Sequence, residues 1–393
     1  MKPMTIVFFS NPDFFGAEKM PQFMSMPRFT SMLAEGMTER GHRVKIWSPG
    51  SAFFNMPVKG PIKKWLGYID QYIVFPAAVK RRMKECPEDT LFVFTDQAQG
   101  PWIKLVEKRR HVMHCHDFLA QFSALGKIPE FKTSWTGKKY QQFIRNGYFK
   151  AKNFISVSHK THSDLVELIG DKASKSAVVY NGLDKSYKQQ DQVKSRTILG
   201  NKTGVDLSQG FLMHIGGNQW YKNRIGVVEI YNAWRDLGNT LPLLLIGAEP
   251  SEDLAQLISS SSYTKDIHAI SGLSDLYVRH AYCAASLFLF PSLAEGFGWP
   301  IAEAMASGCP VLTTGEAPMN EVAGDAGFFI PRRSAESPER WAKDAALQVQ
   351  HIINLPSAAF EAVVEKSLAN VTRFDLKSAL NQIEDIYNEI THS

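Results

Sequence analysis

Glu295 and Glu303 are separated by seven residues and follow the apolar run 287–290. Carboxylates accept hydrogen bonds from hydroxyl groups, and charge-assisted bonds are the strong ones. The pattern predicts a buried strand, a loop holding Glu295, and a short helix with Pro300 near its start and Gly308 after its end. Ligands of open α/β sheets bind beyond the carboxyl ends of the strands. The two glutamates could therefore hold a hydroxyl-rich ligand.

A simpler interpretation exists for Glu303, which we expect in the first turn of that helix. A glutamate there is favoured by the helix dipole alone, by about 0.3–1 kcal/mol. The sequence by itself leaves both interpretations open.

A second cluster follows the apolar run 211–215. Gly216 and Gly217 precede a helix expected from about Arg224. Free backbone N–H groups and the positive end of a helix dipole form an anion site. Lys222 adds a point charge suited to a diphosphate. The alternative is a solvated, basic helix start.

Three histidines lie within six residues at the end of another strand, His111, His114 and His116, and Asp117 follows them. Two residues apart on a strand, His114 and His116 point to the same face, which is compatible with a metal site. No third ligand is identifiable, so metal binding is the less favoured interpretation. An acidic neighbour could fix the tautomer of His116, although a histidine buried at a strand end is an equally ordinary feature.

The segment 291–310 resembles the signature of retaining, nucleotide-sugar-dependent glycosyltransferases of family 4, which have the GT-B fold. The resemblance implies that Glu295 contacts the donor sugar and that Glu303 binds the ribose. It also implies that the backbone of three residues lines the sugar: Gly296, Phe297 and Gly298.

The clusters around Lys222 and His116 resemble two further positions of that family. His116 corresponds to the histidine that backs the donor sugar near its anomeric centre. The family often has an arginine where this chain has Asn218, so Lys222 is the basic residue carried over and Arg224 is the candidate for the second cation. The resemblance places these residues at or near the diphosphate: Gly16, Gly217, Asn218, Lys222 and Arg224.

The family retains anomeric configuration, and no obvious nucleophile is placed here. The resemblance therefore favours front-face displacement, in which His116 and Glu295 polarise the sugar and Lys222 stabilises the leaving diphosphate. No two aspartates are separated by a single residue, so the Asp-x-Asp metal motif of the other large glycosyltransferase architecture is missing. We expect metal-independent activity without a cofactor.

The sequence does not encode the base, the sugar or the acceptor legibly. We favour a UDP-sugar over a GDP-sugar, and a glycan or lipid-linked acceptor from bacterial envelope assembly. A sugar-nucleotide epimerase, a phosphorylase of the same fold, and a non-catalytic partner that binds glycan or membrane remain alternatives. A dinucleotide oxidoreductase is disfavoured because no G-x-G-x-x-G follows the first strand.

Charge is distributed unevenly along the 393 residues. Residues 1–200 carry 31 Lys and Arg against 17 Asp and Glu, whereas residues 201–393 carry 13 against 22. The first half is therefore expected to meet an anionic partner, such as a membrane surface or a lipid phosphate. Nucleic acid is disfavoured because no binding motif accompanies the charge. Basic and aromatic residues interleave at 59–84 and 127–145, which could dock on anionic lipid or form ordinary solvated helix faces.

Four scattered cysteines suggest a reducing compartment. No signal peptide is apparent and no apolar run approaches ~20 residues. We expect a cytoplasmic protein with a peripheral contact on the inner face of the plasma membrane.

The chain is long enough for two domains. We expect an α/β fold of two Rossmann-like domains with parallel sheets facing across a cleft. The acceptor-binding domain spans 1–190, the nucleotide-sugar domain 207–375, and a final helix, about 376–393, crosses back to the first domain. The polar segment 185–209 is expected to connect them. Strands are expected at 5–10, 43–48, 91–95, 112–115, 154–157, 177–180, 211–215, 243–246, 286–290 and from residue 311.

Overall fold

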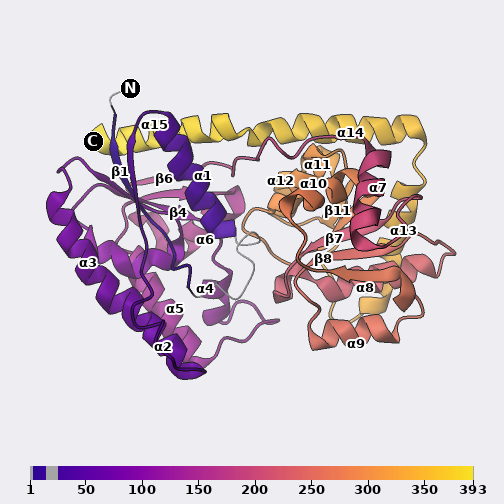
Figure 1. Ribbon diagram of the computed structural model, residues 1–393, viewed down its shortest axis with the longest axis horizontal. Helices are drawn as coiled ribbons and strands as arrows, with labels where there is room; N and C mark the ends of the chain where they lie inside the picture. The colour runs from indigo at the N-terminus through magenta and orange to yellow at the C-terminus, as the bar shows by residue number, and fades with distance from the viewer. Residues whose placement is uncertain (1–2, 15–24, 393) are drawn as a thin grey trace. The chain divides into compact units, whose positions relative to one another are not determined.

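The computed structural model describes residues 3–14 and 25–392. The chain forms two compact units, the first from Met1–Tyr180 with Lys377–Ser393 and the second from Asn181–Leu376 (Figure 1). Each unit holds a six-stranded sheet whose neighbouring strands all pair in parallel. The expected class, two α/β domains with parallel sheets, is confirmed.

The first sheet has the order β2-β1-β3-β4-β5-β6, and the second has the order β12-β11-β10-β7-β8-β9. The first contains β1 (Thr5–Phe9), β2 (Arg43–Trp47), β3 (Leu91–Phe94), β4 (His111–Cys115), β5 (Asn153–Ser156) and β6 (Lys175–Val178). The second contains β7 (Leu212–Gly216), β8 (Leu243–Gly247), β9 (Ile267–Ile270), β10 (Leu287–Phe290), β11 (Val311–Thr314) and β12 (Phe328–Ile330). The ten predicted strands are all present. The short strands β9 and β12 were not predicted.

Helices surround both sheets. Those of the first unit are α1 (Ser25–Glu39), α2 (Pro61–Ile69), α3 (Phe75–Arg82), α4 (Leu119–Ala124), α5 (Trp135–Tyr148), α6 (His159–Ile169) and most of α15 (Leu376–His392). Those of the second are α7 (Gln192–Thr203), α8 (Arg224–Arg235), α9 (Glu252–Ser260), α10 (Asp275–Ala284), α11 (Trp299–Ala306), α12 (Met319–Ala323), α13 (Pro338–Ile353) and α14 (Ser357–Val371). Shorter helical segments are the π-helix η2 (Asp70–Val74) and the 3-10 segments η3 (Met83–Glu85), η4 (Gln97–Leu105), η5 (Gly170–Lys172), η6 (Trp220–Lys222), η7 (Thr264–Asp266), η8 (Gly324–Ala326) and η9 (Thr372–Phe374).

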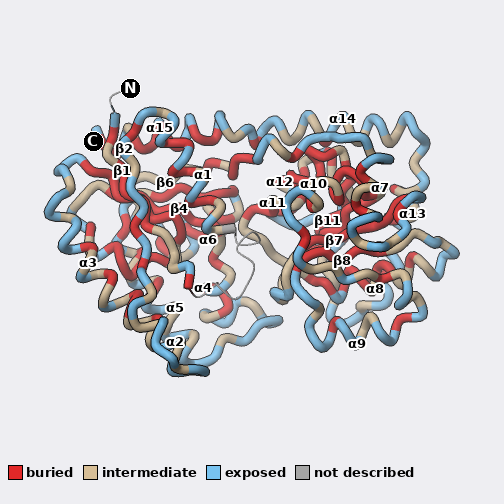
Figure 2. The backbone as a smooth tube through the Cα atoms, viewed as in Figure 1, coloured by how far each residue is buried: buried red, intermediate tan, exposed pale blue. Residues whose placement is uncertain are grey.

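The cores follow the apolar runs that predicted the strands. The central strands of each sheet are buried on both faces, as is usual in parallel sheets, and they are among the most deeply buried segments of both units (Figure 2). In the first unit, one face of the sheet packs against η4, α3, α5 and α6. In the second unit, α8 and α13 cover one face.

The final helix α15 belongs to the first unit, as expected, and polar contacts fix it there. The Glu384 carboxylate accepts a hydrogen bond from His42 Nε2 at 2.9 Å and pairs with Arg40 at 3.2 Å. The Tyr387 hydroxyl shares a 2.7 Å hydrogen bond with His114 Nε2. This buried polar set fixes the helix in register, while Ile383 and neighbouring apolar side chains supply most of the buried area.

The segment 185–209, which was expected to connect the two domains, lies within the second unit and contains α7. Asp191 caps the start of that helix through Lys194 N at 2.8 Å, and Gly204 ends it in the left-handed conformation. Leu199 is fully buried, and Arg196 donates to Ala284 O at 3.1 Å. The expectation failed because polar composition describes only the exposed face of such a helix.

In each sheet the strand order reverses beside its first strand. The chain leaves β1 for β2 on one side and β3 on the other, and leaves β7 for β8 on one side and β10 on the other. At such switch points the loops beyond the strand ends diverge and leave room for a ligand. The sequence clusters that could do chemistry all lie at the carboxyl ends of the strands of these two sheets, which we call the carboxyl edges, or directly beneath them.

Candidate functional site

The loops after β7 and β10 are bound to each other. Leu293 N donates to Tyr221 O at 2.7 Å, and Asn223 Nδ2 donates to Pro291 O at 2.9 Å. Asn223 has φ 51°, a left-handed conformation that asparagine tolerates, and its Oδ1 caps α8 through Gly226 N at 3.2 Å. One asparagine thus sets both the start of α8 and its distance from the β10 loop.

Lys222 and Glu295 meet across these two loops. Lys222 Nζ donates to both oxygens of the Glu295 carboxylate, at 2.8 and 3.0 Å. The side chains are only 15% and 8% exposed, respectively. The Lys222 ammonium also lies 5.1 Å from the centre of the Phe290 ring. The structure therefore brings together the two charged residues that the sequence assigned to different parts of one ligand.

His214 lies beneath this pair and was given no role from the sequence. Its Nδ1 donates to Leu289 O at 2.9 Å, and its Nε2 has no hydrogen-bond partner within the described part of the chain. Burial, with smaller contributions from the charges of Arg224 and Lys222, lowers the pKa of His214 to about 3, although the hydrogen bond to Leu289 O opposes the shift. The ring is therefore neutral, and it adds no competing charge beside Lys222.

Arg224 points inward from the first turn of α8. Its Nη1 donates to Asn218 Oδ1 at 2.6 Å and to Ala248 O at 2.8 Å. Burial lowers the pKa of Arg224 to about 10, while nearby Glu249 raises it. Nε and Nη2 of Arg224 have no partner among the described residues. The guanidinium thus lies directly beside Asn218, and Gly217 lies in the same loop.

The backbone after Glu295 turns sharply into α11. Gly298 has φ 100°, which disfavours any side chain, and precedes the first residue of the helix. The Phe297 ring is buried against Phe374 with their centres 5.3 Å apart, and Gly296 lies between it and Glu295. Because the Phe297 side chain is used in packing, its backbone is the part suited to a ligand.

Glu303 is buried in the second turn of α11, not in the first turn as expected. The helix begins at Trp299, one residue before the proline that marked its start, so Glu303 is its fifth residue. A simple interaction with the helix dipole falls off within the first turn, so it does not account for Glu303. Its Oε2 accepts a hydrogen bond from the Tyr282 hydroxyl of α10 at 3.1 Å. No sequence signal indicated Tyr282.

In the first unit, His116 follows β4 and is buried. Its Nε2 donates to Thr95 O at 2.9 Å, and its backbone N donates to Gln97 Oε1 at 3.0 Å. The Phe29 ring contacts the imidazole edge-on at 4.5 Å between ring centres. Burial lowers the pKa of His116, while the Asp96 carboxylate raises it. Thr95 therefore fixes the tautomer that we had expected an acidic neighbour to fix.

The other two histidines have structural partners. Lys152 N donates to His111 Nε2 at 3.2 Å, so Nδ1 carries the hydrogen and donates to Arg109 O at 2.8 Å. His114 contacts Tyr387 as described above. No group of three possible metal ligands occurs within residues 3–14 and 25–392.

A polar network beside His116 was missed from the sequence. Asn11 Nδ2 donates to Asp96 Oδ2 at 2.6 Å, and Gln99 Nε2 donates to Asn11 Oδ1 at 3.1 Å. Gln97 Nε2 donates to Asp117 O at 2.6 Å. These residues follow β1, β3 and β4, so strand ends alone could have indicated them. Gly16, the remaining predicted residue of this edge, lies outside the described residues.

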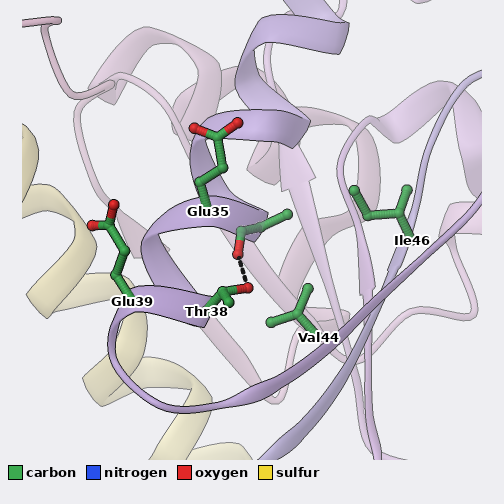
Figure 3. A pocket seen from close by; sticks show the side chains of 6 residues that line it. Glu35, Thr38, Glu39, Val44 and Ile46 are labelled. Atoms are coloured by element: carbon green, nitrogen blue, oxygen red, sulfur yellow. Dashed lines mark hydrogen bonds between the residues drawn. The ribbon is translucent and has the colours of Figure 1, made fainter.

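A hollow of about 440 Å³ lies elsewhere in the first unit, between α1 and the edge strand β2 (Figure 3). Its wall combines Glu35 and Glu39 with the apolar side chains of Val44 and Ile46. None of the predicted site residues lines it.

Sequence models of two families match this chain. "Glycosyltransferase Family 4" matches residues 26–187, and "Glycosyl transferases group 1" matches residues 211–346. The chain belongs to glycosyltransferase family 4. The family match covers both units and includes every predicted site residue except Gly16.

Named relatives agree with this membership. The O-antigen chain mannosyltransferase B of Escherichia coli is 27% identical over 204 residues, which are 51% of this chain and 53% of that protein. The lipopolysaccharide glucosyltransferase WaaG of Escherichia coli is 22% identical over 310 residues, or 74% of this chain and 77% of that one. The aligned part thus spans about half the length of the first relative.

Solved structures show the same fold. The crystal structure of WaaG has a TM-score of 0.70 at 21% identity, over 97% of this chain and 99% of that one. Anabaena HepE in complex with UDP has a TM-score of 0.68 at 17% identity, over 98% and 100%. The fold of this family-4 chain is therefore GT-B. Within the described ranges, no helix combines the length and apolarity needed to cross a bilayer.

Proposed function

We propose that this protein is a retaining glycosyltransferase that moves a hexose from a nucleoside-diphosphate sugar to a glycan or lipid-linked acceptor. The observation that carries the proposal is the contact between Lys222 and Glu295 at the carboxyl edge of the second sheet. A cation can bind the diphosphate and a carboxylate can bind the sugar hydroxyls, so the two groups hold the donor on either side of the bond that breaks.

Lys222 stabilises the departing diphosphate together with the backbone around Gly217 and the first turn of α8. Arg224 supplies the second positive charge. It lies beneath the loop after β7 and is bonded to Asn218 of that loop. A fixed charge in a largely buried site stabilises charge in the transition state without reorganisation. No described side chain is assigned here as a covalent nucleophile, so the acceptor attacks the face that the diphosphate leaves, and the diphosphate takes its proton.

Glu295 and the backbone of residues 296–298 hold the hydroxyls of the sugar. Glu303 takes the ribose diol, with Tyr282 orienting its carboxylate. His116 polarises the sugar near its anomeric carbon, an assignment that rests on the family resemblance. In the neutral form, which burial favours, the Nε2–H is bonded to Thr95 O, so Nδ1 can accept a hydrogen bond without adding charge.

We propose a UDP-sugar as the donor and an envelope polysaccharide or its lipid-linked precursor as the acceptor. HepE has been crystallised with UDP and with UDP-glucose, and the relatives act in O-antigen and lipopolysaccharide synthesis by name. We also propose that turnover needs no divalent metal, because Lys222 and Arg224 already bring positive charge to the diphosphate. Full activity in EDTA is the expected result, and abolition of turnover by EDTA would contradict it.

The donor assignment is tested by thermal unfolding with a panel of UDP-, GDP- and ADP-sugars. A ligand present at about 100 times its Kd stabilises the folded state by ~2.7 kcal/mol, so one base should stand out. Transfer must then require an acceptor. Turnover without any acceptor would indicate an epimerase, and a requirement for inorganic phosphate would indicate a phosphorylase. Absence of any nucleotide-sugar binding would refute the proposal.

We further propose that the first unit docks peripherally on the cytoplasmic face of an anionic membrane. Ile62, Trp65 and Ile73 are exposed along α2 and η2, and Trp65 is 67% exposed. Residues three and eight apart lie on the same side of a helix, so these side chains form an apolar stripe that no other described element buries.

Helix α5 continues this surface. The Tyr72 and Tyr140 hydroxyls share a 2.7 Å hydrogen bond, and the Tyr72 and Phe143 rings are 5.2 Å apart. At its first residue α5 presents Trp135, which is 72% exposed. The two helices therefore present their exposed aromatic side chains from one packed assembly.

The charge around this stripe is nearly all positive. The basic residues of segment 59–84 are Lys59, Lys63, Lys64, Lys80, Arg81, Arg82 and Lys84. The segment's one acidic residue, Asp70, is buried and accepts hydrogen bonds from Phe53 N and Phe54 N. Each well-placed cation near an anionic bilayer contributes about 1 kcal/mol.

Co-sedimentation with liposomes tests the docking. Wild-type protein should bind vesicles that contain anionic lipid and bind neutral vesicles weakly. Trp65→Ser with Trp135→Ser should lose most of that binding, whereas Leu347→Ser, which removes an exposed side chain of the second unit, should not. Equal binding to neutral and anionic vesicles, or full binding by the double variant, would contradict the docking surface.

A further inference from the structure

The ion pair of Lys222 and Glu295 has a consequence for which ligand the site prefers. The lysine assigned to a diphosphate holds a carboxylate of the protein itself, at 2.8 and 3.0 Å. The carboxylate meant for sugar hydroxyls is in turn held by that lysine. Glu295 thus occupies the position of the diphosphate at Lys222, and Lys222 occupies the position of the sugar hydroxyls at Glu295. A donor must therefore displace this ion pair in order to bind.

The fold places this pair rigidly. Lys222 is the last residue of η6. Its neighbours in the chain are both bound to the β10 loop, Tyr221 to Leu293 and Asn223 to Pro291. Both ends of the pair are thus anchored by neighbours that lie within two residues of them in the chain. The position of the pair is therefore set by the fold.

Glu295 therefore responds differently to two ligands. A nucleoside diphosphate without sugar withdraws Lys222 from Glu295 and leaves a nearly buried carboxylate beside further negative charge. Removing one partner of a buried ion pair is strongly unfavourable. An intact donor withdraws the lysine in the same way, but its sugar hydroxyls give the Glu295 carboxylate new hydrogen-bond donors.

We propose that Glu295 acts as an internal competitor for Lys222, and that it makes the site prefer the intact donor over the spent nucleoside diphosphate. The inference rests on the proposed function and adds a role in specificity to it. After transfer the sugar leaves, the carboxylate loses its hydroxyl partners, and Glu295 recovers Lys222. Release of the nucleoside diphosphate is thereby favoured over rebinding.

The test uses Glu295→Gln, which removes the competing charge and keeps the shape. Calorimetry measures affinity for inorganic pyrophosphate, for UDP and for UDP-glucose, with GDP, ADP and their sugars if the donor panel selects another base. Pyrophosphate and the nucleoside diphosphate should bind the variant at least ~5-fold more tightly than wild type, which corresponds to about 1 kcal/mol. The intact donor should gain less or lose affinity, so the preference for donor over diphosphate should fall.

Two controls isolate the pair. Glu229→Gln removes a carboxylate from another ion pair of the same unit, with Arg333 at 2.6 Å, and should leave both affinities unchanged. In the Lys222→Ala background, Glu295→Gln should no longer raise the affinity for pyrophosphate, because the lysine for which Glu295 competes is absent. Thermal unfolding of Glu295→Gln confirms that the variant is folded, and Glu295→Ala repeats the comparison if it is not.

The outcomes separate this inference from the proposed function. If wild type binds the intact donor but neither Glu295 variant binds diphosphate more tightly, the competition is refuted and the transferase assignment stands. If wild type binds neither donor nor diphosphate, the proposed function fails and the inference falls with it.

Discussion

The carboxyl edges of the two sheets use polar residues in opposite ways. At the second edge, Lys222, Glu295 and the buried Arg224 carry full charges, and Arg224 keeps donors without partners. At the first edge, His116 is neutral, Asn11 and Gln99 bond to one another, and the Asp96 carboxylate is held by Asn11. An edge with charged groups and free donors suits a ligand with a charge of its own, whereas an edge whose polar groups are bonded to one another suits the shaping of an uncharged group.

The largest expected effect comes from removing a charged side chain of the second edge. Lys222→Ala and Glu295→Ala should each lower kcat/KM by at least ~100-fold, or ~2.7 kcal/mol of transition-state stabilisation. Steady-state kinetics with the selected donor measures the loss. Lys265→Ala, which removes an exposed lysine of the same unit, should remain close to wild type. Near wild-type activity in both site variants would contradict the assignment.

A smaller effect compares one buried histidine from each unit. Burial lowers the pKa values of His114 and His214 to about 3, against about 6.5 in an unfolded chain. The unfolded state therefore binds the proton first, so the stability that each neutral ring contributes is present above pH 6.5 and is lost as the pH falls towards 3. Between pH 7 and pH 5 each histidine should cost about 2 kcal/mol of unfolding free energy.

Urea denaturation at both pH values measures this loss. His114→Gln and His214→Gln should each reduce the difference between pH 7 and pH 5, whatever they cost at pH 7. An unchanged pH dependence in both variants would show that neither ring is the source.

The smallest expected effect tests the role of Glu303 in the second unit. Tyr282→Phe removes the hydroxyl that donates to Glu303, at a cost of about 1 kcal/mol. Because Glu303 is assigned to the ribose, donor KM should rise about 5-fold while kcat changes little. Tyr231→Phe, which removes a hydroxyl bonded to Leu241 O, is the matched control. Equal kinetic effects in the two variants would argue against the ribose assignment.

The fold was largely predictable because buried parallel strands are apolar on both faces. The run 287–290 is four apolar residues and became β10, whereas β12 has only three residues and β9 contains His268 with an exposed Ala269. Those two strands lie at the edges of their sheet, where one side lacks a neighbour. Their sequences therefore carry little of the signal that identifies a central strand.

The sequence pointed to candidate site residues but did not predict their contacts. Gly-rich turns after apolar runs located Lys222 and Glu295, but their pairing depends on the β7–β10 neighbourhood, which joins residues 73 positions apart. Arg224 could be expected at a helix start, yet its inward direction follows from Asn218 and Ala248. The contact of Glu303 with Tyr282 depends on how α10 packs against α11, for which short sequence patterns carry no information.

Helix α15 also constrains the order of events during synthesis. The first unit needs this helix to bury Ile383 and to give His42 and His114 their partners, Glu384 and Tyr387. The ribosome, however, makes α15 only after the whole second unit. The second unit is thus complete while the face of the first unit that α15 contacts is still exposed. A nascent chain of this kind should depend on protection of that face until its last helix emerges.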